Sequence, residues 1–181
     1  IFSKYDTENE DYDNRFNLLG TSEVMPNTNN LLEGQFGFDV ADDSWKIYCS
    51  NEGNVVYNRN IDYVRSGRGS LLMELPKADS YAEATLLFTP SKAGYYTVTA
   101  WVKTETNSQV AMRVSLQNGD TISESIRYTS KNDWTKMKLT FSVNTVNKPI
   151  EIEIYGVGTG RAFIDDAQVC FGNANYNTNL F

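Results

Sequence analysis

Short runs in which apolar and polar residues alternate constrain the fold of this chain more than any other feature of its sequence. The clearest run has apolar side chains at every second position, namely Tyr96, Val98, Ala100 and Val102. Runs at 110–116, 137–143 and 150–154 repeat the pattern. Successive side chains of a β-strand point to opposite faces, so each run predicts a strand with one buried and one solvated face. No apolar stripe with a 3.6-residue period appears, and the chain is therefore expected to be all-β.

The fold class follows from the number of such runs and from the turns between them. Turn-forming sequences separate the runs at 91–94 and 117–120. With 181 residues, 40% of them hydrophobic, the chain is long enough to bury the core of one domain. Many one-sided strands bury their apolar faces best as two packed sheets, which predicts a β-sandwich of the jelly-roll type with two antiparallel sheets.

The composition of the two ends predicts the domain organisation. Residues 1–28 are acidic and polar, which is typical of a linker or a docked arm, and residues 29–172 are expected to form the β-sandwich. Residues 173–181 are expected to be a linker or the start of a following module, because 177–181 resembles the sequence at 27–32. A chance match between two Asn-rich segments explains that similarity equally well. The start at Ile1 rather than Met suggests a piece of a longer, exported protein, with neighbouring domains of the same chain as partners.

Charge and composition exclude several classes of function. The net charge is -7 and the 16 basic residues are scattered, so no basic patch for nucleic acid is expected. The chain has no histidine, which excludes catalytic triads with a histidine base and zinc sites with histidine ligands. No apolar run approaches the ~20 residues of a membrane span. The two cysteines, Cys49 and Cys170, either form a disulfide or are free, and their strand parity mildly favours free thiols.

Two adjacent acids, Asp165 and Asp166, interrupt the apolar run from Ala162 to Val169. An uncompensated carboxylate in a core costs several kcal/mol, so a bound cation or dense backbone hydrogen bonding must offset the charge. Calcium suits such a site, because it accepts six to eight oxygen ligands in flexible geometry. Ile164 breaks the parity of the surrounding apolar residues, which indicates a bulge that aims a carboxylate inward. The alternative is a pair of acids that accept backbone hydrogen bonds without a metal.

Several segments together resemble the jelly-roll carbohydrate-binding modules of families four, nine and twenty-two. The resemblance spans about residues 29–171 and rests on their order: Asn30 to Leu32, Phe38-Asp39, Trp45, Ser66 to Leu71, Gly94 to Lys103, Asp133 to Lys136, and Ala162 to Val169. It implies a structural calcium held by Asp39, by backbone oxygens near Ser66 to Gly69, and by Asp165 or Asp166. The chain has Asp39 where the family usually has Glu, which implies a weaker or differently shaped site.

A saccharide surface needs exposed aromatic rings beside planar polar side chains. In the usual jelly-roll order, one sheet combines the runs that start near residues 81, 110, 123 and 150. Its outward side chains then form a candidate ligand-binding groove of Tyr81, Glu83, Arg113, Gln117, Arg127, Glu153 and Tyr155. The two tyrosines would be platforms for sugar rings, and the polar residues would bind hydroxyl groups. Alternatively, Arg113 or Arg127 opposite Glu153 forms only a cross-strand ion pair.

Three functions remain open on the sequence. The first is a non-catalytic module that binds a polysaccharide or oligosaccharide in a secreted or cell-surface bacterial protein. The second is a structural spacer in a repeat-containing surface protein. The third, catalysis, has little support, because Asp165 and Asp166 are neighbours and a glycosidase needs two carboxylates across a cleft. Trp101 lies outward by parity, so it is either covered by a loop or by the N-terminal arm, or exposed.

Overall fold

The structure is a computed structural model that describes residues 31–32, 38, 44–129, 131 and 133–172. One short 3-10 helix, η2 (Ile61–Tyr63), lies between the second and third strands. The strands are β1 (Trp45–Ser50), β2 (Asn54–Asn58), β3 (Ser70–Phe88), β4 (Gly94–Thr104), β5 (Gln109–Leu116), β6 (Thr121–Glu124), β7 (Thr135–Val143) and β8 (Ile150–Phe171). The all-β class predicted from the sequence is confirmed.

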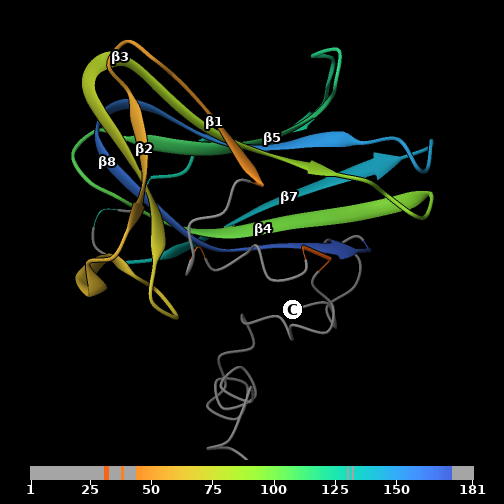
Figure 1. The fold of residues 1–181 in the computed structure, drawn as a ribbon, viewed down its shortest axis with the longest axis horizontal. Coiled ribbons are helices and arrows are strands. Elements are labelled where there is room, and N and C mark those ends of the chain that lie inside the picture. The colour runs from red at the N-terminus through yellow and green to blue at the C-terminus, as the bar shows by residue number, and fades with distance from the viewer. Residues whose placement is uncertain (1–30, 33–37, 39–43, 130, 132, 173–181) are drawn as a thin grey trace, which may run out of the picture.

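Two long strands, β3 and β8, build both layers of the sandwich. Residues 80–88 of β3 and 150–158 of β8 pair with each other and form the first layer with β1, which pairs with β3, with β5, which pairs with β8, and with β6, which pairs with β5. Residues 70–75 of β3 and 160–171 of β8 form the second layer with β2, which pairs with β3, with β4, which pairs with β8, and with β7, which pairs with β4. All pairings are antiparallel, and the predicted grouping of the runs near 81, 110, 123 and 150 is confirmed. Figure 1 shows β3 and β8 curving at one end of the molecule from one layer to the other.

The core lies between the layers and follows the predicted alternation. The runs at 96–102, 110–114, 137–143 and 150–154 turn their apolar side chains into it. Leu116 is an exception, since it lies exposed at the end of β5. Burial of this continuous apolar surface is the main stabilising term of the fold, at about 25 cal/mol for each Å² removed from water.

Two glycines make the bend of β8 possible. Gly158 and Gly160 have φ angles of +94° and +126°, which side-chain-bearing residues rarely adopt. A Cβ at Gly158 would lie 2.4 Å from the carbonyl oxygen of Asn107, and one at Gly160 would lie 2.4 Å from that of Glu105. The connection between β4 and β5 therefore packs directly against the bend of β8.

Two further expectations concern the cysteines and the membrane. Cys49 and Cys170 are free thiols, in the first and second layers respectively. Within the described ranges, no helix is long and apolar enough to cross a membrane. The predicted segments 1–28 and 173–181 lie outside the described residues, and the domain boundaries stay a prediction.

Candidate functional site

The outer face of the first layer gathers most of the predicted ligand-binding residues. Strand pairing places Glu83 of β3 between Tyr48 of β1 and Tyr155 of β8. One row further along, Glu153 of β8 lies between Thr85 of β3 and Arg113 of β5. Residues directly opposite each other on neighbouring strands share a face. The face therefore brings tyrosines and charged side chains from β1, β3, β5 and β8 together.

Three tyrosines, Tyr48, Tyr81 and Tyr155, form what we call the tyrosine row. Tyr81 stacks on Tyr155 with ring centroids 5.7 Å apart and an interplanar angle of 24°. Tyr48 meets Tyr81 edge-on with centroids 6.0 Å apart. The row crosses three strands, so it is a property of the folded sheet rather than of any one segment.

Arg113 is the centre of an ionic network next to this row. Its Nε donates to the Glu153 carboxylate across 2.6 Å, and its guanidinium lies 3.3 Å from Glu83. The hydroxyl of Tyr81 donates to Glu83, and that of Tyr155 donates to Glu124. The guanidinium also lies over the ring of Tyr155, 5.3 Å from its centroid. Each carboxylate of the network thus accepts at least one hydrogen bond within the protein.

The pKa values of the network follow from burial and from these bonds. Burial, together with the hydrogen bond to Glu83, raises the pKa of Tyr81. Burial and the hydrogen bond to Glu124 raise the pKa of Tyr155, and Arg127 opposes that rise. For Arg113, burial alone would lower the pKa, but the hydrogen bond to Glu153 and the surrounding negative charge leave it raised. At neutral pH both phenols are protonated donors and the guanidinium is charged.

The predicted ligand-binding residues differ in how far they are exposed to solvent, and some are too buried to contact a ligand. Tyr81 and Arg113 are half-buried on the face, whereas Tyr155 and Glu153 are only 5% and 4% exposed. Arg127 is exposed, and its guanidinium interacts with the hydroxyl of Tyr155 by a hydrogen bond and by its charge. Tyr155 therefore supports Tyr81 from beneath instead of offering a ring to solvent. The ion pair expected as the alternative, between Arg113 and Glu153, is present.

Gln117 lies apart from this group. It follows the last residue of β5, Leu116, in the exposed turn to β6. Four residues along a strand correspond to about 13 Å, which separates Gln117 from Arg113.

Sequence analysis missed Tyr48, whose ring is 60% exposed and is the most open of the tyrosine row. Strand parity would have placed its side chain opposite to that of Ile47. The missing information was the partner of β1, because only its pairing with β3 brings Tyr48 beside Glu83 and Tyr81.

The acidic pair forms a second polar cluster, on the outer face of the second layer. Asp165 is fully buried and accepts from the backbone N–H groups of Arg65, Ser66 and Asp166 at 2.9, 3.2 and 2.8 Å. Asp166 accepts from the hydroxyl of Ser66 and pairs with the guanidinium of Arg65. These bonds attach the connection between β2 and β3 to β8, across about 100 residues of sequence.

This cluster fits a cation by charge, since two carboxylates face a single guanidinium. Burial and the charge of Asp166 raise the pKa of Asp165, which means that the chain's own donors only partly offset its negative charge. Calcium would take oxygens of Asp165 and Asp166 and would have to share them with Arg65. Across the described ranges no group of three acids, cysteines or histidines stands ready to hold a metal. Calcium stays a prediction.

The remaining predicted calcium ligands are Asp39, Ser66 and Gly69, and the structure describes the last two. Asp39 lies outside the described residues. Ser66 donates its hydroxyl to Asp166, so its backbone carbonyl is the group left for a metal. Gly69 packs tightly, because a Cβ there would lie 2.4 Å from the carbonyl oxygen of Phe38 and 2.1 Å from the guanidinium of Arg59.

The bulge predicted near Asp165 is present, but it points the carboxylates the opposite way. The pairing shifts between Trp101–Asp165 and Thr99–Gln168, and Asp166 has a φ of 49°. This extra residue resets the alternation, so that residues 162, 164, 167 and 169 all face the core. Asp165 shares the outer face with Trp101. The ring of Trp101 is covered by the guanidinium of Arg65, 3.7 Å from its centroid, and is 9% exposed.

Comparisons with known proteins place the fold among carbohydrate-binding modules. No protein-family model and no curated protein matches the sequence. A family 61 module solved in complex with β-1,4-galactotriose has a TM-score of 0.60 and 20% identity, covering 77% of this chain and 97% of the module. The C-terminal family 22 module of Clostridium thermocellum Xyn10B has a TM-score of 0.55 and 15% identity, covering 75% of this chain and 89% of the module.

A third similar structure comes from a different kind of protein. The enzymatically active domain of tailspike protein 4 of bacteriophage CBA120 has a TM-score of 0.61 and 17% identity, covering 78% of this chain but only 21% of the tailspike chain. At these identities the comparisons show a shared fold. This chain therefore has the β-sandwich of carbohydrate-binding modules, as the resemblance in its sequence implied.

Proposed function

We propose that this chain is a non-catalytic module that binds a polysaccharide or oligosaccharide on the outer face of its first layer. The observation that carries the proposal is the exposed edge of the tyrosine row, where Tyr48 and Tyr81 meet at 6.0 Å. The C–H faces of a pyranose pack against aromatic rings, and two adjacent rings offer a longer contact than one. The fold shared with a module solved in complex with β-1,4-galactotriose supports the same class of ligand.

The ionic network supports this surface in two ways. It holds Tyr81 by the bond from its hydroxyl to Glu83, and it holds Tyr155 beneath Tyr81 by the bond to Glu124. Preorganised rings lose less conformational entropy when a ligand binds. Arg113 keeps part of its guanidinium exposed and can donate to a sugar hydroxyl.

A structural spacer is the second candidate, and one observation favours it. Tyr155 and Glu153 are almost completely buried, and the charged groups of the face are paired with one another. A face whose polar groups are already satisfied needs no ligand. In either function, the chain is expected in a secreted or cell-surface protein beside other domains.

Catalysis is not part of the proposal. Asp165 and Asp166 are adjacent on one strand and hold the connection between β2 and β3. They do not face each other across a cleft, as the acids of a glycosidase do. We assign them to the stability of the sandwich.

A glycan titration tests the proposal. The full chain is titrated by calorimetry with oligosaccharides of β-1,4-galactan, xylan and mixed-linkage glucan, and Tyr48→Ala is compared with the unchanged protein. We expect binding of at least one glycan to weaken about tenfold or more in Tyr48→Ala, because tenfold corresponds to about 1.4 kcal/mol and burial of a large apolar side chain contributes about 1.5–3 kcal/mol.

The matched control is Tyr95→Ala, which removes a similarly exposed tyrosine from β4 in the second layer. It should leave binding unchanged. Absence of binding to every glycan would refute the proposed function and favour the spacer. Equal losses in both variants would show that this face is not the binding surface.

A further inference from the structure

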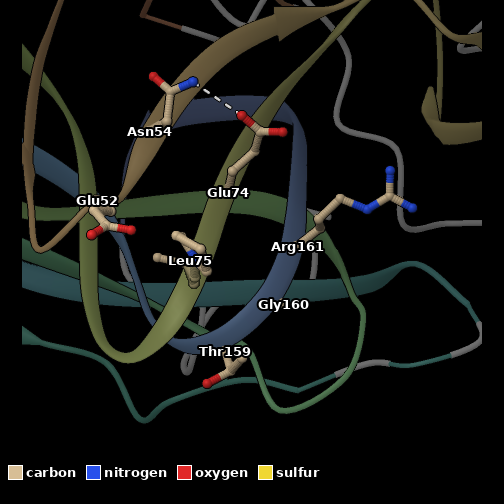
Figure 2. Close-up of a pocket in the computed structure, with 8 residues that line it drawn as sticks. Glu52, Asn54, Glu74, Leu75, Thr159, Gly160 and Arg161 are labelled. Atoms are coloured by element: carbon tan, nitrogen blue, oxygen red, sulfur yellow. Dashed lines mark hydrogen bonds between the residues drawn. The ribbon is translucent and has the colours of Figure 1, made fainter.

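A pocket at the bend of the sandwich lies apart from the tyrosine row. The register between β3 and β8 shifts there, since Leu75 pairs with Gly160 but the next pair is Ser80 with Gly158. Residues 76–79 of β3 thus face a single residue of β8, Thr159. The surplus of backbone opens a cavity of about 520 Å³ between the two strands and the turn after β1 (Figure 2). Cavities of about 300–1,000 Å³ are the usual size of small-molecule sites.

The β8 side of this pocket is held in place by hydrogen bonds from the connection between β4 and β5. The N–H of Asn107 donates to the carbonyl of Thr159 at 2.9 Å, and the hydroxyl of Ser108 donates to the carbonyl of Arg161 at 2.7 Å. Gly160 lets the connection between β4 and β5 pack closely behind the strand. A ligand would therefore meet a preformed shape.

The charges around the pocket leave one carboxylate uncompensated. Glu74 of β3 lies directly opposite Arg161 of β8, where opposite charges normally pair. Arg161 instead bonds to Glu105 through two contacts of 2.6 and 3.0 Å, and Figure 2 shows its side chain directed away from Glu74. At the pocket rim, Lys77 pairs with Glu52. Of these three acids, Glu105 and Glu52 each have a cation, whereas Glu74 forms no ion pair with any residue that the structure describes.

The contacts of the Arg161 side chain explain why it does not pair with Glu74. Its guanidinium lies 5.1 Å from the ring centroid of Tyr63 and 5.5 Å from that of Phe163, and it donates to the hydroxyl of Tyr63 at 3.3 Å. These contacts add to the bidentate bond with Glu105, which is itself a strong geometry. Among the residues that the structure describes, the side-chain donor to Glu74 is the amide of Asn54, at 3.0 Å.

We propose that this pocket is a second ligand site, separate from the tyrosine row, for a single sugar-sized unit that carries a primary ammonium group, such as an amino sugar. The ammonium would pair with Glu74, which has no cationic partner within the described ranges. Asn54 and the hydroxyl of Thr159 supply planar and rotatable hydrogen-bonding groups for ring hydroxyls. No aromatic ring lines the pocket, so charge rather than stacking selects the ligand.

Nuclear magnetic resonance titration of the full, isotope-labelled chain tests this inference. Glucosamine is compared with glucose and N-acetylglucosamine, which have the same ring without the ammonium charge. We expect glucosamine, at millimolar concentration, to shift amide signals of 52–54, 74–75 and 159–161, and the two neutral sugars to shift them much less. High salt should weaken the effect, since exposed charge pairs are screened.

Substitution separates the pocket from the tyrosine row. Glu74→Gln keeps the size of the side chain and should weaken glucosamine binding at least tenfold, while Glu151→Gln, an acid at the start of β8, should not. Tyr48→Ala should leave the pocket signals unchanged, so failure of the proposed function would not affect this result. The inference is overturned if all three sugars give the same shifts, if none shifts these signals, or if Glu74→Gln binds glucosamine unchanged.

Discussion

Arg113 donates from its Nε to Glu153 across 2.6 Å, and this bond crosses from β5 to β8 beside the tyrosine row. Glu153 is 4% exposed, so its charge depends on this partner. The same guanidinium reaches Glu83, which in turn accepts from Tyr81. The pair therefore connects the stability of the sheet with the position of the rings that would bind a sugar.

Removal of Arg113 should destabilise the protein. Arg113→Met leaves Glu153 as a nearly buried carboxylate without its cation, and we expect a loss of about 2 kcal/mol or more in the free energy of unfolding. Urea denaturation followed by tryptophan fluorescence measures this loss. The control is Lys77→Met, which removes an exposed ion pair and should cost less than about 1 kcal/mol.

The double variant Arg113→Met with Glu153→Gln provides the decisive comparison. Because it removes both charges, it should recover a large part of the stability that Arg113→Met loses. If the effects of the two substitutions simply add, the pair has no coupling and the proposed role of Arg113 is wrong.

Tyr81 should make stability fall at alkaline pH. Its pKa is raised in the folded state by burial and by the bond to Glu83, whereas in the unfolded chain it titrates near about 10. A group with a raised folded pKa loses its stabilising contribution as the pH rises from the unfolded value through the folded one. Stability should therefore decrease above about pH 10, and decrease less in Tyr81→Phe. Denaturation midpoints at pH 9 and 11 for both proteins check this; parallel losses would contradict it.

Much of the fold could be predicted because it depends on local alternation. The apolar parity of 96–102, 137–143 and 150–154 is fixed by the pleat of a strand, and the structure keeps it. The predicted direction of the side chains before Asp166 was wrong. Asp166 lies in the left-handed region and forms a bulge, so residues 162 and 164 face the core instead of 163 and 165. A bulge can be inferred from a break in the pattern, but its direction depends on the partner strand.

The candidate site was harder to predict because it combines distant strands. Tyr81, Arg113 and Glu153 were predicted as neighbours from the jelly-roll order, and the register confirms that they share a face. Tyr48 was missed because the partner of β1 leaves no local signal. The burial of Tyr155 was also not predictable, since it depends on Tyr81 and Arg113 packing over its ring.

The two thiols should react at different rates. Cys170 is buried, and burial raises its pKa to about 11, so both access and thiolate formation are poor. Cys49 lies half-buried in an edge strand, although burial raises its pKa as well. We expect a thiol reagent to modify Cys49 in the folded protein and Cys170 only after denaturation. Mass spectrometry of the labelled peptides identifies the modified residue, and equal labelling of both in the native state would contradict the buried position of Cys170.

Calcium should stabilise the protein if it binds the buried acidic pair. Burial and the charge of Asp166 raise the pKa of Asp165, so this pair of acids tends to keep a proton beside Arg65, and a hard cation with oxygen ligands would take the place of that proton. Calcium at a hundredfold excess over its dissociation constant would contribute about 2.7 kcal/mol, which corresponds to a rise of about 5–10 °C in Tm for a chain of this size. Thermal melts with chelator and with added calcium measure the difference.

Asp165→Asn tests whether the acidic pair is the calcium site. For each protein, the melting temperature with calcium is compared with the melting temperature with chelator, so a change in the stability of the variant itself does not affect the comparison. The difference should disappear in Asp165→Asn and persist in Glu151→Gln, whose acid lies in the first layer. Magnesium should have a smaller effect, since it demands a tighter octahedral shell. Identical melts of the unchanged protein with chelator and calcium would mean that Arg65, together with the backbone N–H groups that Asp165 accepts, is sufficient to hold the connection between β2 and β3 in place.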